Sequence, residues 1–107
     1  PSRRLKRAVA LQLAERLNRL GDHVKARNYA DEAAYDYRAE SWWGLLAPSL
    51  REAMKSVKAQ SEFGAWLAYA AELLPACMSG DRAANQRQLL TALADAAHSL
   101  RIAFAAV

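Results

Sequence analysis

The chain of 107 residues is poor in the residue types that define many functional classes. Its single cysteine, Cys77, has no partner for an internal disulfide and favours a reducing compartment. Its two histidines, His23 and His98, are far apart in sequence and do not form a metal-ligand spacing. The longest run without a charge, Ser41 to Leu50, is far shorter than the roughly 20 apolar residues of a membrane span. Disulfide-stabilised, zinc-binding and membrane-spanning classes are therefore disfavoured.

Proline and glycine are also scarce, with three and four residues, which argues against a disordered low-complexity chain. Hydrophobic residues make up 53%, and many are alanines, which suit close helix packing. The first residues are polar and basic, so they do not resemble a secretory signal. Because the chain starts with Pro1 rather than methionine, we expect a piece of a longer protein.

Hydrophobic periodicity predicts an all-α fold of about five antiparallel helices in one domain over residues 1–107, built from α-solenoid or tetratricopeptide-like hairpins. Gly21 predicts the end of the first helix, and Asp22 predicts the cap of the second. The expected buried face of the first helix is Leu5, Val9, Leu13, Leu17 and Leu20. That of the second is Ala26, Tyr29, Ala30, Ala33 and Tyr37.

The third predicted helix runs from near Ser41 to about Gln60, with Pro48 causing a kink or a short turn. Its expected buried face is Trp43, Leu46, Leu50, Ala53 and Val57. Ser61 is expected to cap a fourth helix that ends at Pro75. The apolar stripe of that helix is Phe63, Trp66, Leu67, Ala70, Leu73 and Leu74. A loop over residues 76–80 and a fifth helix from about Asp81 complete the prediction.

No residue pattern points to catalysis or to a cofactor, so we predict that the protein is not an enzyme. Cys77 has no histidine nearby in sequence, and the adjacent carboxylates Asp31 and Glu32 are interpreted as a solvated helix face. The net charge of +4 and the basic start, Arg3, Arg4, Lys6 and Arg7, leave peripheral contact with acidic lipid open. Nucleic acid is disfavoured, because the aromatic residues lie on predicted buried faces rather than between basic ones.

The most distinctive stretch is Tyr37-Arg38-x-Glu40-x-Trp42-Trp43. One interpretation is structural: Arg38 and Glu40 pair at a helix end while the rings fill the groove between hairpins. The other is an interface, because neighbouring tryptophans on a helix point about 100° apart and cannot share one groove. We treat these five residues as a candidate interface.

This stretch resembles the signature of the foie gras (gryzun) family, a large subunit of the transport protein particle (TRAPP). Leu20-Gly21-Asp22-His23 upstream and a helix ending in Glu72-Leu73-Leu74 downstream agree in order, so the resemblance covers about residues 13–75. Ser41 departs from it by standing where glycine is expected.

The resemblance implies a fragment of a much longer, non-catalytic scaffold subunit that acts in endoplasmic reticulum–Golgi vesicle transport and autophagy. Its implied partners are other TRAPP subunits, and its implied location is cytoplasmic, peripheral to Golgi and intermediate membranes. A tetratricopeptide-like adaptor that binds peptides in another pathway is the alternative, as is a basic surface for acidic lipid or nucleic acid.

Overall fold

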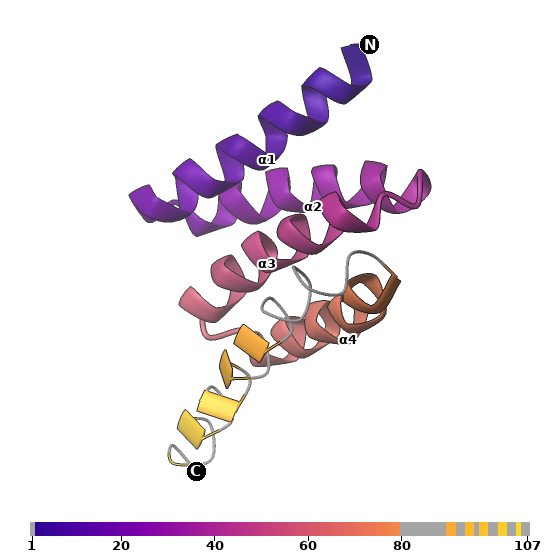
Figure 1. Ribbon diagram of the computed structural model, residues 1–107. Helices are drawn as coiled ribbons and strands as arrows, with labels where there is room; N and C mark the ends of the chain where they lie inside the picture. Colours follow the sequence, from indigo (N-terminus) through magenta and orange to yellow (C-terminus); the bar gives the residue numbers. More distant parts are fainter. Residues whose placement is uncertain are drawn as a thin grey trace.

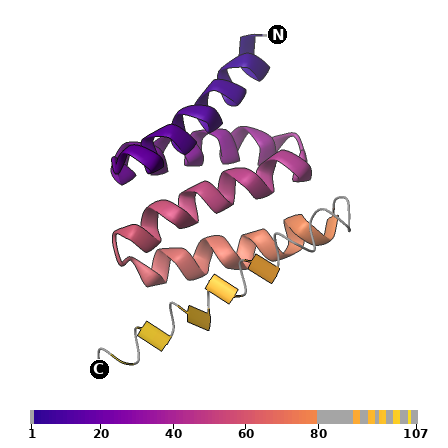
Figure 2. The same ribbon diagram turned by 60° about the vertical axis from the view of Figure 1, so that its left-hand side comes forward.

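The computed structural model describes residues 2–79 and, beyond them, residues 90–91, 94–95, 97–98, 101–102 and 105. Four helices make up the first range: α1 (Ser2–Leu20), α2 (His23–Ala39), α3 (Trp43–Ala59) and α4 (Phe63–Ser79). They stack in chain order, each antiparallel to the one before, with α1 outermost in both views (Figures 1 and 2). The described residues contain no strand, and the predicted all-α class is confirmed.

The three turns between these helices have the same backbone geometry. Gly21, Ser41 and Ser61 have φ angles of 89°, 55° and 59°, the left-handed conformation that favours glycine. In each turn, the backbone N–H of the residue after the left-handed one donates to the carbonyl five positions earlier. Trp42, for example, donates to Tyr37 at 2.9 Å. This hydrogen bond is the 6→1 bond of a Schellman motif. The glycine turn of the first hairpin is therefore repeated twice, with serine in place of glycine.

The predicted cap is confirmed at Asp22, whose Oδ1 accepts the N–H of Lys25 at 3.3 Å. The third helix begins at Trp43, two residues after Ser41, near which its start was predicted. The predicted cap at Ser61 is wrong. Ser61 does not directly precede the fourth helix, because it occupies the left-handed position of the turn two residues before Phe63.

Pro48 and Pro75 both lie inside helices. Of the two alternatives predicted at Pro48, the short turn is therefore wrong, and so is the predicted helix end at Pro75. A proline inside a helix costs about 3 kcal/mol or more through one lost hydrogen bond and a steric clash. At Pro48 the neighbouring residues Ala47 and Ser49 are completely buried, so packing holds the helix together across the proline. The predicted loop is wrong up to Ser79, where α4 ends. The predicted fifth helix lies largely outside the described residues.

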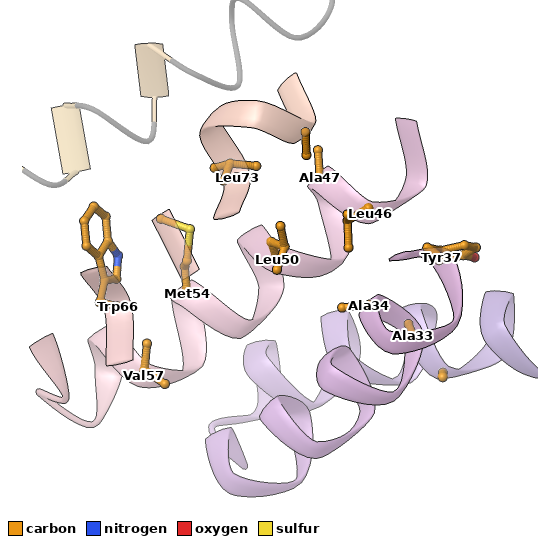
Figure 3. Packing of buried hydrophobic residues seen from close by; sticks show 12 residues of the cluster. Ala33, Ala34, Tyr37, Leu46, Ala47, Leu50, Met54, Val57, Trp66 and Leu73 are labelled. Atoms are coloured by element: carbon orange, nitrogen blue, oxygen red, sulfur yellow. The ribbon is translucent and has the colours of Figure 1, made fainter. Parts of the chain in front are cut away.

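The core changes in character along the stack. The buried apolar residues of α1 and α2 are all alanines except Tyr37, namely Ala10, Ala14, Ala26, Ala30, Ala33 and Ala34. Around α3 and α4 it is built from larger side chains, namely Leu46, Leu50, Met54, Val57, Trp66 and Leu73 (Figure 3). The expected buried faces of α2 and α3 are largely confirmed, although Tyr29 and Trp43 are only partly buried.

The expected buried face of α1 is wrong at three of its five positions. Leu5, Val9 and Leu20 are 68%, 44% and 82% exposed, while Ala10 and Ala14 are buried. The other two, Leu13 and Leu17, are partly buried. Small alanine side chains let α1 approach the alanines of α2 closely, so the buried side of α1 is centred on Ala10 and Ala14 rather than on the leucines. The prediction for α4 also fails in part, because Leu67 and Leu74 are exposed.

Candidate interaction site

Tyr37 and Trp42 enclose the guanidinium of Arg7, a residue of α1 that is 2% exposed. Its central carbon lies 5.6 Å from the centroid of the Tyr37 ring and 5.8 Å from that of Trp42. The two rings meet edge to face at 6.1 Å. Such cation–π contacts strengthen when water is excluded from the charge. The aromatic pair at the end of α2 therefore fixes the first part of α1.

Glu40 completes the surroundings of this buried charge. Its Oε2 lies 2.8 Å from Nη1 of Arg7. The hydrogen bond to Glu40 raises the pKa of the Arg7 guanidinium, and burial raises the pKa of the Tyr37 hydroxyl. A buried charge is tolerated when it is paired and hydrogen-bonded, as Arg7 is here.

Arg38 points to a different helix. Its Nε and Nη2 both donate to the carboxylate of Glu72 on α4, the second at 2.7 Å, in a bidentate pair. This hydrogen bond raises the pKa of Arg38. The predicted Arg38–Glu40 ion pair is therefore wrong: the two residues pair with α4 and α1 respectively. Bidentate pairing fixes orientation as well as distance.

The two tryptophans have different surroundings. Trp43 is partly buried and packs against the main core cluster. Trp42 is 38% exposed and covers Arg7 with its ring. The structure thus brings Tyr37, Glu40 and Trp42 together around Arg7, and it separates Arg38 and Trp43 from that group.

A second polar group joins α2 to α4. Tyr69 donates its hydroxyl hydrogen to Oδ1 of Asp31 at 2.6 Å and accepts from Nε of Arg27 at 3.1 Å. Arg27 also donates to Glu62 at 3.0 Å. Burial, followed by the hydrogen bond to Asp31, raises the pKa of the Tyr69 hydroxyl. Asp31 was expected on a solvated face and is instead a half-buried hydrogen-bond acceptor.

A third polar group joins α1 to α3. Asn18 donates to the buried carboxylate of Glu52 at 2.9 Å and accepts from Nδ1 of His23 at 2.9 Å. Ser56 donates to the same Asn18 oxygen at 2.8 Å, and Lys55 lies 2.8 Å from the other oxygen of Glu52. His23 thus orients a hydrogen-bond network and has no metal-site neighbours among the described residues.

Sequence reasoning missed most of these partners, because they lie 33 to 42 positions away along the chain. The missed residues are Arg7, Asn18, Arg27, Glu52, Glu62, Tyr69 and Glu72. One signal was available: Arg7 interrupts a run of apolar positions on the inner face of α1. A single charge on such a face indicates a buried, paired residue.

Two open hollows of about 370 Å³ each adjoin α3. One lies between α1 and α3, beside Asn18, Arg19 and Glu52. The other lies over Met54 and Trp66, and Asp95 contributes to its wall. Lys55 lines both. Within the described residues no helix is long and apolar enough to cross a bilayer.

The fold and these contacts define a class, a stack of helical hairpins whose conspicuous polar residues fix helices to one another. The chain belongs to the foie gras liver health family 1, whose model matches residues 1–76. This confirms the predicted family and extends the match to the part of α1 that carries Arg7.

Curated relatives give a more specific likeness. The chain is 32% identical over 71 residues to trafficking protein particle complex subunit 11 of Bos taurus and of Homo sapiens. It is 31% identical over 71 residues to the protein of that name in Gallus gallus. Each alignment covers 66% of this chain and 6% of the relative. No solved structure gives a significant match.

Proposed function

We propose that this chain is a non-catalytic scaffold segment of a trafficking protein particle subunit. It acts in vesicle transport between the endoplasmic reticulum and the Golgi, and in autophagy. The observation that carries the proposal is the family match over residues 1–76, together with relatives named as subunit 11 of that particle. The proposed location is cytoplasmic and peripheral to Golgi and intermediate membranes.

The mechanism that we propose is presentation of a rigid surface to other subunits of the complex. The Arg7 cluster connects α1 to α2, and the Arg38–Glu72 pair connects α2 to α4. The Asn18–Glu52 contact connects α1 to α3. Side chains fixed in this way limit sliding between helices, so a partner meets a surface that is already ordered and loses less entropy on binding.

A chimera tests this proposal. In human subunit 11, the stretch that aligns with this chain is replaced by the corresponding residues of the chain, and the tagged chimera is expressed in cells depleted of the native subunit. We expect co-purification of the other subunits and recovery of secretory transport. The control carries Leu50→Asp in the graft, which places a charge in a completely buried position. A folded chimera that captures no other subunit would contradict the scaffold role.

A peptide-binding adaptor is the second candidate, favoured by the two hollows that meet at Lys55. Arg51, Lys55 and Lys58 follow one side of α3 beside an apolar floor of Met54 and Trp66. This combination suits a short acidic peptide. Replacing Arg51, Lys55 and Lys58 with glutamine would abolish binding of an acidic peptide. The same replacement would leave the assembly of the chimera with the other subunits unchanged.

A further inference from the structure

The outer face of α1 carries an exposed apolar stripe. Leu5, Val9 and Leu20 are large apolar residues that are exposed. Their spacings, four and eleven, place them on one side of a helix with 3.6 residues per turn. Both ribbon views show α1 at the end of the stack of four helices (Figures 1 and 2). Contiguous exposed apolar residues mark interaction surfaces more often than scattered ones do.

The same helix is strongly basic. Its sequence holds six basic residues against one acidic residue, Glu15, which is half-buried. Arg16 and Arg19 are exposed. Arg16 lies seven positions after Val9 and four before Leu20, so it shares the side of the helix that bears the apolar stripe. The described outer face therefore combines leucines with uncompensated positive charge.

We propose that the outer face of α1 binds an acidic amphipathic helix of a partner protein. The proposal rests on the scaffold function above and names the surface and the chemistry of its partner. From Leu5 to Leu20 the stripe is about 22 Å long and one helix wide, dimensions that fit a helix of about four turns. Carboxylates beside the apolar residues of that helix would pair with Arg16 and Arg19.

Arginine–carboxylate pairs already connect helices of the stack. From α2, Arg27 pairs with Glu62, directly before α4, and Arg38 pairs with Glu72 on α4. A partner that brings glutamates to α1 would form further pairs of the same kind.

Two other occupants are disfavoured by the charges. A second copy of the chain would place one basic α1 against another, and like charges across an interface oppose association. A lipid surface would require the guanidinium of Arg16 to enter the apolar layer together with the leucines, which is costly for an unpaired charge. A partner carboxylate neutralises Arg16 without that cost.

The test is a selection from a displayed library of helical peptides, with the complete chain as bait. We expect the selected peptides to combine leucine with aspartate and glutamate. Their affinity should fall at least about tenfold in the triple variant Leu5→Ser, Val9→Ser, Leu20→Ser. The matched control, Leu67→Ser with Leu74→Ser on α4, removes exposed apolar residues elsewhere and should leave binding unchanged. Circular dichroism confirms that both variants fold.

A charge variant, Arg16→Glu with Arg19→Glu, should also weaken the selected peptides at least about tenfold and should favour lysine-rich sequences in a repeated selection. Raised salt should weaken the acidic peptides. An empty selection, selected peptides without acidic residues, or full affinity for the triple variant would overturn the proposal.

Two further measurements identify the competing occupants. If the selection yields no peptide, and the chain binds phosphatidylserine vesicles while the triple variant does not, the face belongs to a membrane contact. If the chain sediments as a dimer and the triple variant as a monomer, the outer face of α1 binds a second copy of the chain. Either result overturns the acidic-helix proposal but leaves the scaffold function standing, because that function is judged by assembly of the chimera.

Discussion

The two halves of the helical stack are held together by different means. The apolar residues that α1 and α2 bury are mainly alanines, whereas α3 and α4 bury leucine, methionine, valine and tryptophan. Burial of a large apolar side chain stabilises by about 1.5–3 kcal/mol, and alanine contributes much less. In the first half, close approach of the helices and the buried Arg7 fix how α1 and α2 fit together. In the second half, burial of a large apolar area supplies most of the stability. The two halves should therefore respond to opposite kinds of substitution.

The largest effect is expected from truncating a large side chain in the second half. Trp66 is buried at 2% exposure, so Trp66→Ala should lower the free energy of unfolding by about 3–5 kcal/mol, measured by urea denaturation. Trp43→Ala should cost less, because Trp43 is only partly buried. Leu67→Ala on the exposed side is the control. Equal midpoints for the Trp66 and Leu67 variants would contradict the claim that buried apolar area stabilises the second half.

Enlarging a residue in the first half comes next. Ala30 is completely buried, and Ala30→Leu forces the facing helices apart, so it should cost about 1–3 kcal/mol in the same assay. Ala8, on the same hairpin but exposed, provides the control as Ala8→Leu, with an expected change near zero. Unchanged stability of the Ala30 variant would mean that the alanine interface is loosely packed.

The polar ties across the stack should have a smaller effect. A double-mutant cycle with Arg38→Gln and Glu72→Gln should give a coupling energy of about 0.5–1 kcal/mol, because both side chains are partly exposed and the pair is bidentate. Raised salt should reduce the coupling. A coupling near zero at low salt would show that the pair does not tie α2 to α4.

The smallest effect concerns the turns. A left-handed conformation costs a residue with a Cβ about 1–2 kcal/mol, and glycine loses part of that advantage through its greater freedom in the unfolded chain. Ser41→Gly and Ser61→Gly should therefore each raise stability by about 0.5 kcal/mol. Gly21→Ser should lower it. Destabilisation by either serine-to-glycine change would point to a role for the hydroxyl group.

Much of the local structure could be predicted from the sequence. The buried faces of α2 and α3 follow from apolar residues at helical spacing, and Asp22 caps α2 as expected. The interface role of the candidate cluster Tyr37, Arg38, Glu40, Trp42 and Trp43 stays a prediction. What could not be predicted was how its members divide among helices, because Glu40 turns to α1 and Arg38 to α4.

The sequence by itself determined the helical periodicity, the first turn at Gly21, and the family to which the chain belongs. These depend on residues within one or two helical turns of each other, or on an ordered set of residue types. Only the tertiary structure decided that α1 presents Arg7, Ala10, Leu11 and Ala14 to the interior and leaves Leu5, Val9 and Leu20 outside. A helix with two apolar faces has no local property that selects between them. The face that fits closely against the neighbouring helix is buried, and for α1 that neighbour is the alanine face of α2.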